Sequence, residues 1–206
     1  IMTQTFGFTY VNEVHRSLKQ VVGPYTLPAG KEGRLAWGFI ILDADARGRP
    51  VLGHCLGGQL IARAFGMRVV ASPAPEIGWH RIRLESGPAA RAWLGEEDGP
   101  LVFQWHGEAF ELPPGAELLA SSEHCPHQAF AIGPHLAMQF HVELNAVKLR
   151  AWAASRDPGY LAAQKRHATV HDGQRMLTDA VQALPRQQRL AAGLRLLRVD
   201  PALQSR

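Results

Sequence analysis

The chain has 206 residues, of which 46% are hydrophobic and 19% are charged, as expected of an ordinary globular domain. Two cysteines are too few for a disulfide scaffold, and no apolar run approaches the roughly 20 residues needed to span a bilayer. The formal charge is +4, but lysine and arginine are scattered along the chain, so no nucleic-acid partner is expected. These features predict one main domain with no membrane contact.

The first 48 residues mix aromatic and β-branched residues with turn residues. A strand is predicted over 5–14 and a helix over 15–20, before a loop that contains Gly23-Pro24. Apolar residues at helical spacing then predict a helix over 35–46.

The most informative segment follows the short apolar strand predicted over 51–54. It reads Gly53-His54-Cys55-Leu56-Gly57-Gly58-Gln59 and leads into a helix predicted over 59–65. Glycines two residues before and after Cys55 are typical of a nucleophile elbow, a sharp turn that lifts the nucleophile above the sheet. The N-terminus of a helix also favours the thiolate form of a cysteine placed there. A buried cysteine in a glycine-rich turn is the alternative.

The rest of the chain alternates short strands with helices. The spacing of apolar and turn residues predicts strands over 69–70, 79–84, 101–105, 117–121, 129–132 and 136–140. Helices are predicted over 88–94, over 145–154 with Asn145 as cap, and over 174–197, where Pro185 should break or kink the helix. This order predicts an α/β core with antiparallel strands added in the second half.

A second candidate for chemistry stands at the end of the strand predicted over 136–140. If the strand continues, His141 and Glu143 point to the same side, because strand side chains alternate faces. A carboxylate beside an imidazole fixes its tautomer and supports its charged form. A cysteine, a histidine and an acid that are distant in sequence can meet in the fold. We therefore expect Cys55, His141 and Glu143 to form a catalytic triad.

The two motifs, Gly-His-Cys-Leu-Gly-Gly-Gln and Gln-Phe-His-Val-Glu, resemble those of class I, triad-type glutamine amidotransferases, in particular stand-alone proteins similar to the glutaminase domain of GMP synthetase. Further stretches over 76–79, 105–108, 112–116 and 121–130 fit the same family, and the resemblance covers about residues 21–153. It implies a flavodoxin-like, mostly parallel sheet flanked by helices. It also implies an oxyanion hole from the main-chain amides of Gly23 and Leu56.

The same resemblance implies that Gln59 and a loop of His106, Gly107 and Glu108 bind the substrate. Two positions depart from the family pattern. Val142 stands where proline is more usual, and Val22 replaces one glycine of the oxyanion loop. No cofactor is implied, and the His124-Cys125-Pro126-His127 run lacks a second ligand pair at zinc-like spacing.

The expected activity is hydrolysis of the glutamine side-chain amide through a glutamyl thioester. Two alternatives stay open: a γ-glutamyl peptide hydrolase of the same fold, and an amidotransferase-like binding protein with an impaired site. Residues 1–154 are expected to form the amidotransferase-like domain and residues 155–206 a helical extension packed on it. The protein partners considered are a second copy of the chain, in a homodimer, and an acceptor-substrate synthase subunit. A nucleophilic cysteine must stay reduced, so the cytoplasm is the expected location.

Overall fold

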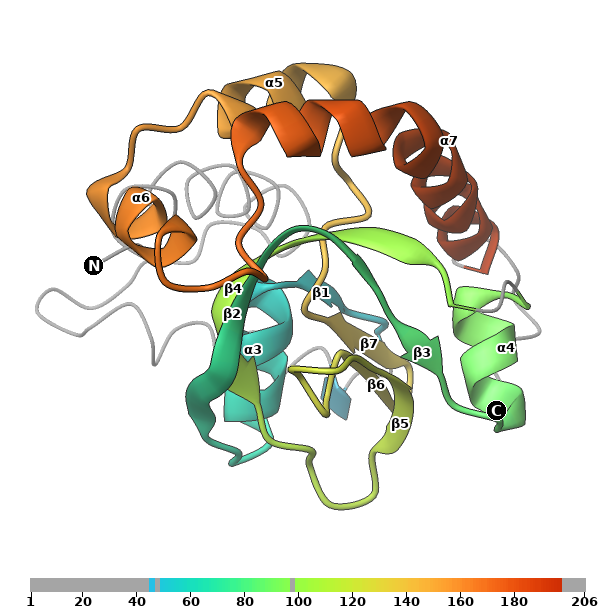
Figure 1. Ribbon diagram of the computed structural model, residues 1–206. Helices are drawn as coiled ribbons and strands as arrows, with labels where there is room; N and C mark the ends of the chain where they lie inside the picture. The colour runs from blue at the N-terminus through green and yellow to red at the C-terminus, as the bar shows by residue number, and fades with distance from the viewer. Residues whose placement is uncertain (1–44, 47–48, 97–98, 198–206) are drawn as a thin grey trace, which may run out of the picture.

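The computed structural model describes residues 45–46, 49–96 and 99–197 (Figure 1). The strand and helix predicted over 5–14 and 15–20, the loop with Gly23, and nearly all of the helix predicted over 35–46 lie outside the described residues. Within them, strands and helices alternate in the order β1 (Leu52–His54), α3 (Leu56–Ala64), β2 (Val69–Arg81), β3 (Arg83–Leu84), α4 (Pro88–Leu94), β4 (Leu101–Phe110), β5 (Glu117–Ser121), β6 (Ala129–Ile132), β7 (His135–Met138), α5 (Ala146–Ala153), α6 (Pro158–Gln164) and α7 (Gly173–Leu197).

A five-stranded sheet has the order β1-β7-β6-β5-β3, and β2 and β4 form a separate antiparallel pair. β1 and β7 are parallel, whereas β7, β6, β5 and β3 pair antiparallel. The α/β fold with a mixed sheet and antiparallel strands in the second half is therefore confirmed. The carboxyl ends of the parallel pair matter most for function, because open α/β sheets bind ligands beyond the carboxyl ends of their parallel strands.

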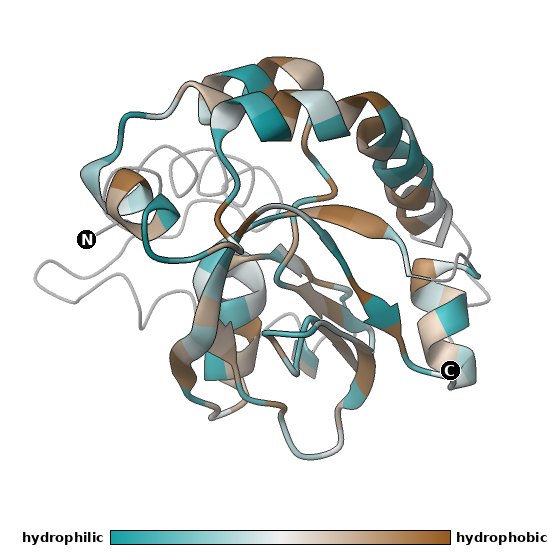
Figure 2. Cartoon of the chain, viewed as in Figure 1, coloured by the Kyte–Doolittle hydropathy of each residue, from teal (hydrophilic) through white to brown (hydrophobic). Residues whose placement is uncertain are grey.

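Alternation along β6 and β7 divides the core between the two faces of the sheet. Phe130 and Ala137 pack with Ile61 of α3 on one face. Leu136 and Met138 pack with residues of α4 and α7 on the other. Figure 2 shows hydrophobic residues along the strands and in stripes on the helices, as this two-sided packing requires.

A third cluster joins the β2–β4 pair to the helices that follow the sheet. The strands contribute Ile77, Trp79 and Phe103 to this cluster, and helices α6 and α7 contribute Tyr160 and Met176. Helices α6 and α7 thus pack against the β2–β4 pair. Figure 1 shows α5 and the first part of α7 lying across one end of the molecule.

Several predicted elements have the expected bounds, and others differ for clear physical reasons. β2 joins the strand predicted over 69–70 to the first part of the strand predicted over 79–84. Pro73 and Pro75 lie in the stretch between them, where the pairing of β2 with β4 shifts register between Ala71 and Glu76. Pro185 does not end α7, which continues to Leu197 but changes direction along its length (Figure 1).

Candidate active site

Cys55 lies in a strained turn between β1 and α3. Its backbone has φ 46° and ψ −109°, and it is the one non-glycine residue with positive φ among those described. Its main-chain N–H donates to the oxygen of Met138 at 2.7 Å, which ties the turn to the end of β7. Strain of this kind persists only where the surrounding structure fixes it, and it is typical of a nucleophile elbow.

Two glycines make this turn sterically feasible, and one of them differs from the expected pair. A Cβ on Gly53 would lie 2.4 Å from the carbonyl carbon of Gly57, and one on Gly58 would lie 2.7 Å from the oxygen of Met138. A Cβ on Gly57 meets no described atom within 4 Å. Gly58, which packs α3 against β7, is therefore the second required glycine, rather than Gly57.

His141 and Glu143 lie beyond β7, in a turn and not in a continued strand. β7 ends at Met138, so the alternation that we expected to align the two side chains does not apply. They nevertheless meet, with His141 Nδ1 2.8 Å from Glu143 Oε1. The turn, and not strand alternation, brings the side chains of these two residues together.

Cys55 and His141 approach each other because β1 and β7 are parallel neighbours. Gly53 pairs with Ala137, so the segments beyond both strands leave the sheet at the same edge. Burial lowers the pKa of His141, but the Glu143 carboxylate and the Cys55 side chain raise it more strongly, to about 9. The same contact with His141 holds the pKa of Glu143 below its ordinary value, against the effect of burial.

β4 supplies main-chain acceptors to both residues. The Cys55 thiol donates to the oxygen of Trp105 at 3.8 Å, and the His141 N–H donates to the oxygen of Phe103 at 2.9 Å. Phe103 and Trp105 are two residues apart, so their carbonyls point to the same edge of β4. This edge sets the spacing between the candidate nucleophile and the candidate base.

The ring of His141 is also packed against α5. It meets the Trp152 ring edge-on, with centroids 4.9 Å apart. Lys148, one turn earlier on α5, lies 3.3 Å from Glu143 Oε1 and 5.4 Å from the centroid of Trp152. The first turn of α5 is held by Asn145, whose side chain accepts from the N–H groups of Val147 and Lys148, as the sequence predicts for a cap.

Two of the residues expected to bind substrate, Gln59 and His106, meet the unexpected Gln139 at the main-chain oxygen of a third, Glu108. The main-chain oxygen of Glu108 accepts from Gln59 Nε2 at 3.2 Å and from Gln139 Nε2 at 2.6 Å, and lies 3.2 Å from His106 Nδ1. However, residues 106–108 belong to strand β4 and form no loop, so the expected closing loop is wrong. The His106 ring is buried, whereas Gly107 and Glu108 are exposed.

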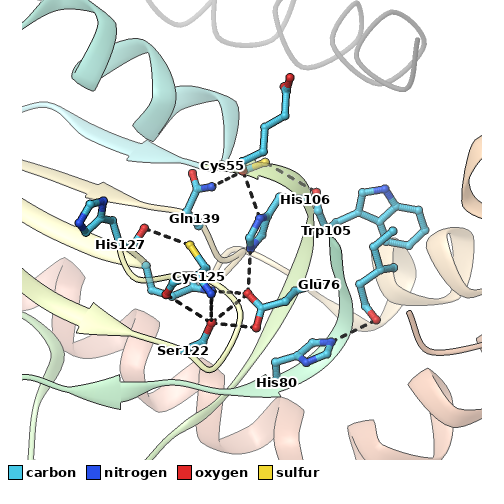
Figure 3. A network of polar contacts seen from close by, with 12 residues as sticks. Cys55, Glu76, His80, Trp105, His106, Ser122, Cys125, His127 and Gln139 are labelled. Atoms are coloured by element: carbon cyan, nitrogen blue, oxygen red, sulfur yellow. Dashed lines mark hydrogen bonds and ion pairs between the residues drawn. The ribbon is translucent and has the colours of Figure 1, made fainter. Parts of the chain in front are cut away.

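Behind this carbonyl lies a buried polar network that the sequence did not predict (Figure 3). Glu76 stands opposite His106 in the β2–β4 pair, and its carboxylate lies 3.4 Å from His106 Nε2. It also accepts from the Ser122 hydroxyl at 2.8 Å and from Gln128 Nε2 at 2.6 Å. Burial raises the pKa of Glu76, but these contacts, led by His106, lower it overall.

Cys125 lies at the edge of this network and is more deeply buried than Cys55. Its side chain is fully buried, and its thiol donates to the oxygen of His127 at 3.4 Å. Burial raises its pKa to about 12. Glu76, His106 and Cys125 stand close enough to share a metal ion, but the carboxylate oxygens already accept from protein donors. We interpret the network as structural support for β4.

The comparisons with known proteins agree with this geometry. The model of the family "Glutamine amidotransferase class-I" matches residues 38–149, and the chain belongs to that family. It is 37% identical over 110 residues to the glutamine amidotransferase-like protein YfeJ of Salmonella typhimurium, covering 50% of this chain and 46% of that protein. It is 27% identical over 176 residues to one of the subunits of the glutamine-hydrolyzing GMP synthase of Ignicoccus hospitalis, covering 70% of this chain and 89% of that subunit.

Solved structures give the same result. A glutamine amidotransferase from Methylobacillus flagellatus superposes with a TM-score of 0.73 at 33% identity, covering 84% of this chain and 72% of that one. The chain spans 46% of YfeJ and 33% of the GMP synthase of Aliarcobacter butzleri, so it covers less than half of these two relatives. No helix among the described residues is both long and apolar enough to cross a membrane.

Proposed function

We propose that the chain hydrolyses the side-chain amide of glutamine, with Cys55 as nucleophile, His141 as proton carrier and Glu143 as the partner of His141. The observation that carries this proposal is the contact of His141 with Glu143 at 2.8 Å, on a histidine whose pKa Cys55 also raises. A cysteine paired with a histidine that a carboxylate orients is the arrangement used for acyl transfer.

The reaction follows from these roles. The sulfur of Cys55 attacks the amide carbon of glutamine, while His141 holds the proton taken from the thiol. His141 then gives this proton to the departing nitrogen, the C–N bond breaks, and ammonia leaves a glutamyl thioester. Water attacks the thioester carbon, loses a proton to His141, and releases glutamate and the thiol.

The negative oxygen of the tetrahedral intermediate needs donors aimed at it. Leu56 is the first residue of α3, directly after Cys55, and the first N–H groups of a helix have no intrahelical acceptor. We assign the Leu56 N–H to the oxyanion. Gly23, the second expected donor, lies outside the described residues and stays a prediction. Loss of one such donor typically costs about 3 kcal/mol of transition-state stabilisation.

Two glutamine side chains are held at the main-chain oxygen of Glu108. Gln59 and Gln139 each donate an amide N–H to the main-chain oxygen of Glu108, and these hydrogen bonds fix both side chains beside Cys55. We assign substrate contact to Gln59 and to the exposed segment Gly107-Glu108. The buried His106 ring lies between the Glu108 oxygen and the Glu76 carboxylate, so we assign it to positioning β4 instead of touching glutamine.

The ammonia has a candidate recipient in a separate synthase. The Ignicoccus hospitalis GMP synthase subunit matches this chain over 89% of its own length, and its name describes one part of a glutamine-hydrolyzing synthase. We propose that this chain also supplies ammonia to a synthase polypeptide. A homodimer and a cytoplasmic location stay predictions.

The test is glutamate and ammonia release from glutamine by the purified chain and by Cys55→Ala. The proposal predicts release by the wild type and none above background by the variant, with unchanged circular dichroism. A γ-glutamyl peptide, assayed in parallel, distinguishes glutamine hydrolysis from γ-glutamyl peptide hydrolysis. Hydrolysis of the peptide with no attack on glutamine would replace the proposed substrate, and activity of Cys55→Ala would refute the proposed nucleophile.

A further inference from the structure

One polar side chain interrupts the apolar stripe that α7 turns toward the sheet. Residues at spacings of three and four along this helix pack inward, and all but one are apolar: Met176, Ala180, Ala183, Gln187, Leu190 and Leu194. Gln187 is only 1% exposed. A carboxamide buried to this degree costs free energy unless its hydrogen bonds are made, so its partners indicate why it is there.

Both ends of the Gln187 carboxamide bind main chain next to the candidate active site. Its Oε1 accepts from the N–H of Phe103 at 2.7 Å, and its Nε2 donates to the oxygen of His141 at 3.0 Å. The N–H of His141 in turn donates to the oxygen of Phe103 at 2.9 Å. The three groups form a closed ring of hydrogen bonds.

This ring resembles one residue pair of an antiparallel ladder in which a side chain replaces one of the two direct hydrogen bonds. Two facing residues of an antiparallel pair exchange both of their N–H···O bonds. Phe103 and His141 keep one of these bonds directly, and the carboxamide of Gln187 bridges the other. The segment after β7 is thereby held against β4 at His141 without continuing as a strand, which leaves the chain free to turn toward Glu143.

We propose that Gln187 is a positioning residue for His141. It fixes the main chain of the histidine, whereas Glu143 and Trp152 fix the ring. The family match ends at residue 149, so α7 contributes this support from outside the matched segment. A neutral carboxamide is the group required, because one end must accept a hydrogen bond and the other must donate one. The catalytic part of this inference rests on the proposed function.

The test replaces Gln187 by methionine, which keeps the length of the side chain and removes both hydrogen bonds. Gln188→Met is the matched control, since Gln188 is the next residue on α7 and is exposed. Leu194→Ala is a second control that lowers the stability of α7 packing without touching the ring. The measurements are kcat and KM for glutamine, the melting temperature, and the NMR titration of the His141 ring, assigned by its loss in His141→Gln.

The inference predicts that Gln187→Met lowers kcat by about 10-fold to 100-fold, as small displacements of catalytic groups do, with little change in KM. It also predicts a fall of the His141 pKa from about 9 toward its ordinary value of 6.5. Gln188→Met should match the wild type. Leu194→Ala should keep the wild-type kcat and the wild-type pKa of His141, even where its melting temperature falls as much as that of Gln187→Met. If Gln187→Met does not fold, Gln187→Asn replaces it, because the shorter carboxamide cannot span both main chains.

Two results would overturn the inference. In the first, Gln187→Met keeps the wild-type kcat and the wild-type pKa of His141. In the second, Leu194→Ala lowers kcat and the pKa of His141 as much as Gln187→Met does. A wild type that hydrolyses no glutamine would instead count against the proposed function. The His141 titration in the same variants would still decide whether Gln187 positions the histidine.

Discussion

His54 Nδ1 lies 3.8 Å from Glu143 Oε2, on the opposite carboxylate oxygen from the one that contacts His141. The residue before the candidate nucleophile thus lies within ion-pair distance of the candidate acid. Lys148 adds a third nitrogen-bearing side chain within ion-pair distance of the same carboxylate. Glu143 is therefore held as a carboxylate, and its charge is available to keep a proton on His141.

Glu143→Gln should lower kcat/KM for glutamine by about 100-fold, because the amide cannot stabilise the charged imidazole that carries the proton. The variant should still bind a glutamine-like inhibitor. Glu111→Gln is the control, since Glu111 pairs with Arg68 in a different part of the chain. Near wild-type kcat/KM in Glu143→Gln would remove this residue from the mechanism.

The two glycines beside Cys55 should differ sharply in their response to alanine. Gly53→Ala forces a Cβ to within 2.4 Å of backbone, so the turn must move. We expect a loss of about 3 kcal/mol in unfolding free energy or more. Gly57→Ala meets no described atom within 4 Å and should cost far less. Urea denaturation of the two variants measures the difference, and equal losses would contradict the proposed packing.

The stability of the fold should depend on pH through His141. Its pKa rises from 6.5 to about 9 on folding, so the native state binds more protons within that window. The stabilisation is complete below the unfolded pKa and is lost as pH rises through the folded pKa. It amounts to about 3 kcal/mol at most. Denaturation of wild type and His141→Gln at several pH values should show their difference in unfolding free energy shrinking with rising pH; a constant difference would refute it.

The buried carboxylate of Glu76 should be essential for stability. Glu76→Ala removes the shortest hydrogen bonds of the Ser122 hydroxyl and Gln128 Nε2, and it removes the carboxylate beside His106 Nε2. Breaking a buried network of this kind costs about 3–5 kcal/mol. Because the pKa of Glu76 is lowered on folding, its contribution is present above the ordinary value of 4.5 and lost as pH falls through the folded pKa. A melting temperature equal to that of the wild type would contradict this assignment.

Local patterns were enough to predict the elements that depend on local chemistry. The elbow at Cys55, helix α4, strands β5 and β6 and the cap at Asn145 all follow from glycine, proline and capping residues at fixed spacings. The family resemblance also identified the candidate triad, although the strand alternation used to align His141 with Glu143 was wrong.

The missed features depend on contacts between distant segments. The pairing of Glu76 with His106 needs the register of β2 and β4, which the proline-containing shift obscures. Gln187 carried one usable signal, a polar residue at a core position of the amphipathic α7. Its partners, Phe103 and His141, could not be deduced, because helical periodicity says which face is buried but not what that face contacts.

The central claim is that Cys55 is the nucleophile, and labelling with a glutamine-like electrophile tests it most directly. The chain has one other cysteine, Cys125, which is fully buried with a pKa raised to about 12 and so serves as an internal control. We predict rapid addition of one label per chain, located on Cys55 by peptide mass spectrometry and prevented by excess glutamine. Labelling of Cys125 in preference to Cys55, or no protection by glutamine, would contradict the account.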